Sequence, residues 1–291
     1  MEIGVIYVFR RPGWFALFAA VAIVAGCRTA GQTTTQEFSA VYPAADPPAV
    51  VLDIANGTLA LASADADGIT GKVTTNVQDW AVTTAVDARG ALRIAQGSTR
   101  SAVIPTAANA WDVKLSRGTP VNLTINTASA SGTLDLTGMT LPQLTLNGGS
   151  GAFTLSYAAP APVSGGSIAI TQARGAVTIN GALNSGAARL DVTTTSGVQT
   201  YEFSGVGLAE NLRANLTSTT ANIVLRIPAG LPVRVEFITT TGIVRDMPAS
   251  FAAVDRSAFE TGNYASADQP RLLIEVQTVT GSLRVLELGG L

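Results

Sequence analysis

One short unit recurs along most of this chain and limits what the chain can fold into. The unit is an alternating polar and apolar stretch, a small turn that usually contains glycine, and a second alternating stretch, repeated about every 20 residues. Apolar residues at every second position lie on one face of an extended chain, so each stretch is expected to be a half-buried strand. The units begin at these stretches: Val51–Leu61, Val121–Ile125, Leu144–Leu146, Ile168–Ile170, Leu190–Val192, Leu216, Val235–Phe237 and Leu273–Val276.

The repeat favours a β-solenoid, because a short coil cannot bury its apolar face alone and must stack on its neighbours. Strands of an antiparallel sandwich also alternate, but their turns usually fall every ~8–12 residues without a homologous repeat. The sequence therefore predicts an all-β fold, as a single-stranded β-solenoid of the right-handed parallel β-helix type. The antiparallel β-sandwich remains the alternative.

Glycine is expected to supply the positive φ or the close backbone approach that a tight corner requires. In one unit Asn222 is expected to take this role, because Asn tolerates the left-handed region. The expected corner glycines are Gly132, Gly151, Gly175, Gly197, Gly242 and Gly281.

Two segments interrupt the repeat. Residues 72–116 hold alternating stretches joined by Asp87–Gly90, a β-hairpin signature. Residues 38–120 are therefore expected to form an irregular N-terminal β cap with the first coil, ahead of solenoid repeats over residues 121–291.

The second interruption, residues 246–270, is a C-terminal insertion within those repeats. It carries Phe251, Phe259 and Tyr264. These aromatic side chains are expected to plug the open end of the core, which keeps terminal edges from pairing with other chains. An aromatic platform for a ligand is the alternative.

The N-terminus has the features of a secretory signal. Arg10 and Arg11 precede an apolar stretch over residues 14–26, which is shorter than the ~20 residues that a membrane-spanning helix needs. Val24–Cys27 resembles the lipobox of bacterial lipoproteins. We therefore expect residues 1–26 to be a signal peptide cleaved between Gly26 and Cys27, with a lipid anchor on Cys27. Residues 27–37 are polar and aperiodic and are expected to form a flexible tether.

Composition excludes several kinds of function. The chain contains no His and one Cys, so it cannot build Ser-His-Asp triads, Cys-His dyads or metal sites made of His and Cys. Its 18 basic and 20 acidic residues give a net charge of −2, which provides no positively charged surface for nucleic acid. No cofactor, metal or nucleic-acid partner is expected.

The remaining candidate sites are weak. Asp65 and Asp67 begin like a calcium loop, but no Glu closes a twelve-residue loop, so a polar turn is expected. Acidic residues are scattered over outward strand positions and do not form the carboxylate pair of a glycosidase. Trp80 and Trp111 could stack on a sugar ring or belong to the core.

Threonine-rich turns recur in successive units and would align into a ladder of hydroxyls along one edge of a solenoid. These turns are Thr193–Ser196, Thr217–Thr220 and Thr239–Thr241. Such a ladder could contact glycans or the cell wall, or its hydroxyls could satisfy the turn backbone by local hydrogen bonds. Both interpretations stay open at the level of sequence.

The order of these features resembles the toast-rack family, whose N-terminal module occurs in LiaF-like cell-wall stress proteins and related adhesin-like bacterial proteins. The stretches that carry the resemblance are Val50–Leu61, Asn109–Leu115, Pro120–Leu123, Leu134–Gly138, Leu144–Gly151, Leu225–Gly230 and Val233–Val235. The resemblance implies a β-solenoid outside the cytoplasm with no catalytic residue to carry over. Unlike the membrane-embedded LiaF-like members, this chain has a lipobox in place of several transmembrane helices.

These observations predict a non-enzymatic lipoprotein of the cell envelope, facing the cell surface or the periplasm. Its solenoid would act as an adhesin-like, scaffold or interaction module for a glycan or an envelope protein. An envelope-stress regulator that binds a membrane partner is the alternative, and a carbohydrate-active enzyme is a remote third.

Overall fold

The fold consists almost entirely of β-strands. The structure, a computed structural model, describes residues 31–97, 106–265 and 268–289. In this part of the chain it contains strands β1 to β18 and two short 3-10 helices, η1 (Gln78–Trp80) and η2 (Ala182–Ser185). The all-β class is confirmed. No helix among the described residues has the length and apolar character needed to cross a membrane.

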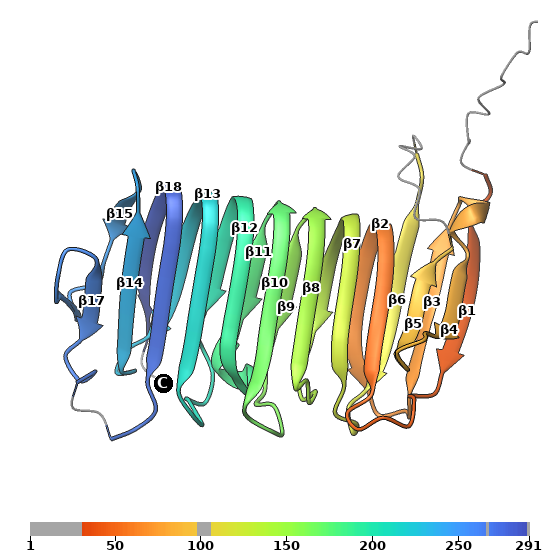
Figure 1. Ribbon diagram of the computed structural model, residues 1–291, viewed down its shortest axis with the longest axis horizontal. Helices are drawn as coiled ribbons and strands as arrows, with labels where there is room; N and C mark the ends of the chain where they lie inside the picture. The colour runs from red at the N-terminus through yellow and green to blue at the C-terminus, as the bar shows by residue number, and fades with distance from the viewer. Residues whose placement is uncertain (1–30, 98–105, 266–267, 290–291) are drawn as a thin grey trace, which may run out of the picture.

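Strands from successive sequence units stack in parallel along the long axis of the molecule (Figure 1). Five long strands each form a whole coil, and three other coils are split into two strands. The whole coils are β2 (Ala49–Ala64), β7 (Asn122–Asp135), β12 (Ala187–Glu202), β13 (Leu212–Pro228) and β18 (Leu272–Leu288). The split coils are β8 (Gln143–Ser150) with β9 (Phe153–Ser156), β10 (Gly166–Arg174) with β11 (Val177–Asn180), and β14 (Val233–Thr239) with β15 (Ile243–Asp246). We call this set the parallel stack.

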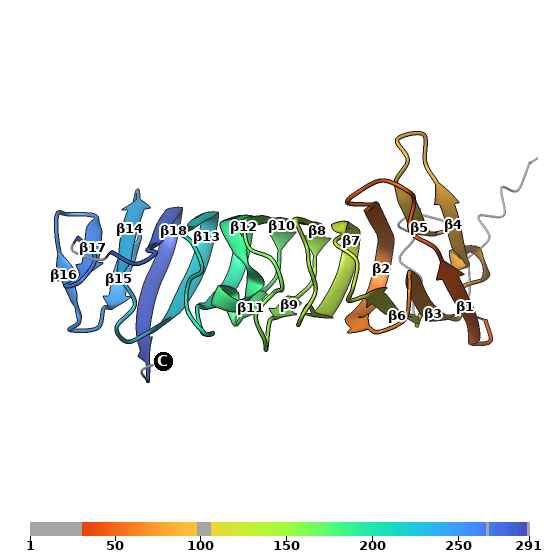
Figure 2. The same cartoon turned by 90° about the horizontal axis from the view of Figure 1, so that it is seen from below.

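The two halves of each coil lie in two layers that face each other across the core (Figure 2). Neighbouring coils keep register, so equivalent side chains form columns along the stack. One buried column runs through the first layer and contains Leu52, Ile125, Leu146, Ile170, Val192, Leu216, Val276 and Phe237. The ladders between coils are parallel, whereas an antiparallel sandwich would require antiparallel ones. Antiparallel pairs occur only toward the two ends of the described stack.

Glycine at the corner between layers allows neighbouring backbones to approach closely. Gly151, Gly175 and Gly197 have φ angles of 130°, 120° and 139°, which L side chains rarely adopt. A Cβ atom on Gly175 would lie 1.6 Å from the carbonyl oxygen of Gly151. The prediction of corner glycines is correct at these positions.

Two residues that were expected to allow a tight corner do not have this role. Gly132 faces the core, where a Cβ atom would lie 2.7 Å from Cε1 of Phe153, so this glycine makes room for an aromatic ring. Asn222 does not adopt the left-handed region, since Thr106 is the only described residue other than glycine with a positive φ. The residue in register with Gly197 is Ala221, which is buried.

The last strand in chain order does not lie at the end of the stack. β18 pairs in parallel with β13 on one side and with β14 and β15 on the other. Figure 1 shows it between them. The coils therefore do not follow sequence order at this end, because the C-terminal coil separates two coils that are consecutive in the chain.

The insertion forms a short antiparallel hairpin beyond β14. Its strands are β16 (Phe251–Ala253) and β17 (Ala258–Thr261), and β17 pairs antiparallel with β14. Phe251 belongs to the core and Phe259 packs against it, as predicted for a plug. Tyr264 instead has the guanidinium of Arg271 5.4 Å from its ring centroid.

At the other end, two small antiparallel groups extend the layers. One group is β1 (Thr34–Ala40), β3 (Ile69–Thr75) and β6 (Asn109–Ser116), and the other is the hairpin of β4 (Val82–Val86) and β5 (Leu92–Gln96). The turn predicted at Asp87–Gly90 is present, with the Gly90 N–H donating to the Asp87 carbonyl at 3.0 Å. β5 and β6 both pair in parallel with β2, which joins these groups to the stack.

The expected tether is shorter than predicted. β1 begins at Thr34 and pairs with β3 along its whole length. Gln36 also bonds to both backbone groups of Val82, with distances of 2.9 and 3.1 Å. Residues 34–37 are thus part of the folded body, because seven residues of antiparallel pairing outweigh a polar composition that resembles a linker. The predicted signal peptide and the cleavage and lipidation residues Gly26 and Cys27 lie outside the described residues.

Candidate functional site

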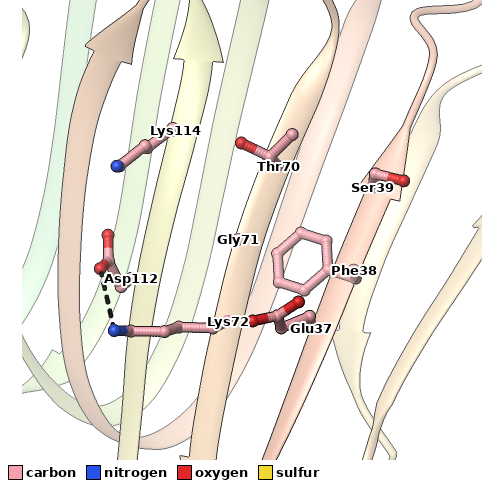
Figure 3. Close-up of a pocket in the computed structure, with 8 residues that line it drawn as sticks. All are labelled: Glu37, Phe38, Ser39, Thr70, Gly71, Lys72, Asp112 and Lys114. Carbon is pink, nitrogen blue, oxygen red and sulfur yellow. Dashed lines mark ion pairs between the residues drawn. The ribbon is translucent and has the colours of Figure 1, made fainter.

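A groove lies on the outer face of the sheet formed by β1, β3 and β6 (Figure 3). Its volume is about 450 Å³. Eight residues line it: Glu37, Phe38, Ser39, Thr70, Gly71, Lys72, Asp112 and Lys114. They come from three segments that are distant in sequence and are brought together by antiparallel pairing.

The strand register arranges the polar lining residues in two rows. Glu37 is opposite Lys72, which is opposite Asp112. In the second row, Ser39 is opposite Thr70, which is opposite Lys114. Alternation places both rows on the same face, because residues two apart on a strand point the same way.

An aromatic ring covers a glycine on the opposite, core-facing side of the same sheet. Phe38 alternates with Glu37 and Ser39, so its side chain points away from the two polar rows and packs against the core. The ring of Phe38 lies over Gly71, where a Cβ atom would come within 2.5 Å of the Phe38 Cζ atom. Phe38 also contacts Trp111, with ring centroids 6.4 Å apart and planes tilted by 57°. Trp111 is buried, so the ring of Phe38 is supported from the core.

The charges of the groove are balanced but only partly paired. Lys72 and Asp112 form an ion pair with an N···O distance of 3.9 Å. Glu37 and Lys114 have no ion-pair partner among the residues that the structure describes. Lys72 and Lys114 are the only two lysines of the sequence, and both line this groove.

The polar groups on this face can bind a ligand through hydrogen bonds. The ammonium groups donate hydrogen bonds, the carboxylates accept them, and the hydroxyls of Ser39 and Thr70 do both. In the described part of the chain, no group of three His, Cys, Asp or Glu side chains could hold a metal ion. The groove therefore offers hydrogen-bond donors and acceptors to a polar ligand.

Comparison with known proteins identifies the family of the N-terminal domain. The N-terminal domain of toast_rack, DUF2154, matches residues 29–161, which include every residue of the groove. Residues 29–161 are therefore a toast-rack N-terminal domain. No curated protein matches this chain in sequence.

Two solved structures are similar to this chain over most of its length. A putative cell adhesion protein from Clostridium sporogenes is 14% identical, with a TM-score of 0.45, and the match covers 88% of this chain and 100% of the other. A putative adhesin from Bacteroides fragilis is 9% identical, with a TM-score of 0.43, and the match covers 88% and 97% of the two chains.

Two of the three predicted threonine-rich turns align: Thr193–Ser196 is in register with Thr217–Thr220. The third, Thr239–Thr241, is separated from them by β18, because Ser218 and Thr239 are both in register with Thr278. Ser218 donates to Thr278 Oγ1 at 3.0 Å, and Thr220 and Thr280 form a second, exposed step of the ladder. These hydroxyls bond to one another across neighbouring strands, and Thr278 also donates locally to the Thr280 carbonyl at 2.7 Å. The exposed side chains beside them are Thr193, Thr195, Thr217, Thr219, Thr240 and Thr241.

The two tryptophans singled out in the sequence are both buried. Trp80 is 3% exposed and packs with Val77, and Trp111 is 1% exposed and donates from Nε1 to Asn109 Oδ1 at 3.1 Å. Neither indole can stack on a sugar at the surface. The interpretation of these residues as core residues is correct.

Several acidic residues are held by arginines, and two glutamates, Glu236 and Glu275, lie opposite each other in neighbouring strands. Asp65 pairs with Arg117 at 3.2 Å and lies in a turn, as expected. Burial alone would raise the pKa of Asp191, but hydrogen bonds from Arg189 and Asn215 lower it below its ordinary value. Four Glu residues are similarly bonded to Arg: Glu202 to Arg226, Glu275 to Arg213, and Glu236 and Glu260 to Arg234.

The groove itself was not predicted from the sequence. Residues 34–37 of its first strand were assigned to the tether, since Phe38 and Ala40 are the only apolar residues of β1. The one available signal was the scarcity of lysine, because the only two lysines follow Gly71 and Val113 at outward positions of alternating stretches.

Proposed function

We propose that this toast-rack protein is a non-enzymatic, adhesin-like interaction module of the cell envelope, whose groove binds a polar glycan. The observation that carries the proposal is the convergence of both lysines, two carboxylates and two hydroxyls on one outward face. Sugars are bound by such combinations, because their hydroxyls both donate and accept hydrogen bonds.

The proposed scaffold is a single-stranded, right-handed β-solenoid. Parallel, in-register coils and corner glycines support it. The right hand is the one that parallel crossover connections take almost without exception. Such a scaffold holds the groove residues on paired strands rather than on loops, so little conformational entropy is lost when a ligand binds.

The proposed anchor is a lipid on Cys27, which places the protein outside the cytoplasm on a membrane. Residues 28–33 separate Cys27 from β1. Six extended residues span at most about 20 Å. The groove, which β1 lines, would then lie near the membrane surface, within reach of glycans or proteins held there.

The same nearness to the membrane favours a second candidate function. An envelope-stress regulator of the LiaF-like kind would bind the extracytoplasmic part of a membrane protein through this surface. Unpaired Glu37 and Lys114 could form ion pairs with such a partner.

Binding to isolated peptidoglycan and to envelope polysaccharide tests the proposal. The protein from Arg28 onward would be sedimented with each material, beside Lys114→Ala and the control Arg256→Ala, whose exposed side chain lies in the hairpin at the other end. We expect wild type and control to bind, and Lys114→Ala to bind about tenfold more weakly, which corresponds to about 1.4 kcal/mol. Equal binding by all three proteins would mean that the groove does not bind the glycan.

A pull-down from detergent-solubilised envelopes separates the two candidates. Capture of a membrane protein that Lys114→Ala fails to capture, without glycan binding, would favour the regulator. Release of soluble sugars from either polysaccharide would contradict the non-enzymatic assignment.

The anchor has its own test. Cells expressing wild type or Cys27→Ser would be labelled with a palmitate analogue and fractionated. We expect label and membrane association to vanish together in the variant. An unlabelled wild type that stays in the membrane would contradict the lipid anchor.

A further inference from the structure

The strand β18 occupies a slot between two segments that precede it in the chain. Leu272, its first residue, is in register with Leu212 of β13 and with Val233 of β14. Toward its other end, Leu283 pairs with Ile223 of β13 and Val244 of β15. Both backbone edges of β18 are therefore paired through both layers of the stack.

The slot is deeply apolar. Five side chains of β18 that face the core are at most 1% exposed: Leu272, Ile274, Val276, Leu283 and Val285. Burial of each such side chain contributes about 1.5–3 kcal/mol. The slot thus binds β18 strongly, and the ladders that β18 forms are with residues 212–246.

The described residues that lead into β18 are hydrogen-bonded to the coil beside it. Asn263 donates to the Gly230 carbonyl at 2.9 Å. The Arg271 N–H donates to Asn211 Oδ1 at 2.9 Å, and the Arg271 carbonyl accepts from the Leu212 N–H at 3.1 Å. Release of β18 therefore breaks its ladders and the bonds of Arg271.

The walls of the slot are complementary to each other as well as to β18. Leu216 and Phe237 are both partners of Val276, one on each side. If β18 is released, β13 and β14 can pair with each other in the same parallel register, as consecutive coils do elsewhere in the stack. This temporary pairing lowers the free energy needed to release β18.

We propose that the slot between β13 and β14–β15 is a strand-acceptor site that takes β18 of a second copy, giving a strand-exchanged dimer. A β18 from another molecule makes the same ladders and the same core contacts as the chain's own strand. Exchange of an identical element is a low-cost route to dimers for this reason. The two copies exchange β18 reciprocally.

Single cysteines at two positions that are in register, one in β13 and one in β18, detect the exchange. Thr220 and Thr280 are exposed neighbours with Oγ1 atoms 3.0 Å apart. Full chains carrying Cys27→Ser with either Thr220→Cys or Thr280→Cys would be mixed, held a few degrees below the unfolding temperature, cooled and oxidised. We expect a disulfide-linked pair of the two chains on a non-reducing gel, in an amount that rises with protein concentration.

The matched control replaces Thr220→Cys by Thr193→Cys, which is exposed and lies two strands away from β18. We expect at least tenfold less of the linked pair from this mixture. Equal amounts from the two mixtures would overturn the proposal, since random collision would then explain the link. A lack of the Thr220–Thr280 pair, while one chain carrying both cysteines closes its own disulfide, would overturn it as well.

Discussion

Thr220 and Thr280 lie opposite each other in neighbouring parallel strands, with their Oγ1 atoms 3.0 Å apart, although they are 60 residues apart in sequence. Directly opposite residues in paired strands fall within the 4.4–6.8 Å Cα separation that a disulfide requires. In a Cys27→Ser chain, the double substitution Thr220→Cys and Thr280→Cys is expected to form an intramolecular disulfide under mild oxidation.

Free-thiol titration and the rise in unfolding temperature measure this disulfide. A cross-link that closes a loop of this length stabilises by about 2–4 kcal/mol. The pair Thr193→Cys and Thr280→Cys is the control and should keep both thiols free. Ready closure of the control disulfide would contradict the position of β18 between β13 and β14.

Gly197 tests the role of the corner glycines. Its φ is 139°, and a Cβ atom would lie 1.8 Å from the carbonyl oxygen of Gly175. Gly197→Ala is expected to lower the free energy of unfolding by about 2–4 kcal/mol, because strain in φ adds to a clash between backbones. Urea unfolding followed by circular dichroism measures the change.

Gly118→Ala is the matched control for this substitution. No atom lies within 4 Å of a Cβ built on Gly118, and its φ is not in the strained range. Its effect is expected to stay within about 0.5 kcal/mol of wild type. Similar losses in both variants would mean that coils do not approach closely at the corner.

Two buried tyrosines are expected to respond in opposite ways to loss of the hydroxyl. The Tyr157 hydroxyl is buried and has no hydrogen-bond partner among the described residues, and burial raises its pKa. The Tyr201 hydroxyl donates to Gln199 Oε1 at 2.6 Å, and that glutamine is fully buried.

Tyr157→Phe is therefore expected to leave the free energy of unfolding unchanged or to raise it. Tyr201→Phe is expected to lower it by about 1–3 kcal/mol, because it leaves a buried acceptor without its donor. Thermal and urea unfolding of the two variants side by side measure the contrast. Equal losses in the two variants would argue against this arrangement of hydroxyls.

Stability is expected to change little between pH 5.5 and 7 and to fall in stronger acid. The sequence has no His, so no imidazole titrates in the neutral range. Backbone N–H groups of Ala91 and Arg89 lower the pKa of Asp87, and Ser257 does the same for Asp255. A carboxyl whose pKa is lower in the folded state stabilises the fold above its ordinary pKa of about 3.9, and this contribution is lost as pH falls through the lowered value.

Unfolding temperatures at pH 7, 5.5, 4 and 3 measure this dependence. Asp87→Asn is expected to show a smaller drop between pH 4 and pH 3 than wild type, because one of the titrating groups is gone. A marked drop between pH 7 and pH 5.5 would contradict the prediction.

Alternation and corner glycines made much of the fold predictable. Leu144 and Leu146 repeat the pattern of Leu190 and Val192, and burial of every second residue follows from extended geometry. The order of the coils was not predictable, because β18 has the same pattern as any other coil. Only its pairing partners, which depend on the whole chain, determine its place.

The candidate site was hidden for a different reason. Its residues come from segments around Phe38, Gly71 and Asp112, and none of these segments carries a recognisable motif. Their meeting depends on two antiparallel ladders that involve β1, whose two apolar residues give almost no periodic signal. The alignment of Thr194 with Ser218, in contrast, followed from the repeat alone.

Because β18 lies between β13 and β14, the core is complete only after the C-terminal strand has been synthesised. During synthesis, residues 233–261 emerge before the strand that will connect them to the rest of the core. A polypeptide that ends before Leu272 would lack β18. The backbone edges of β13 and of β14 and β15 that pair with β18 would then be unpaired. Proteases that degrade incompletely folded proteins would therefore recognise truncated products by these unpaired edges. In the full-length protein the same edges are paired with β18.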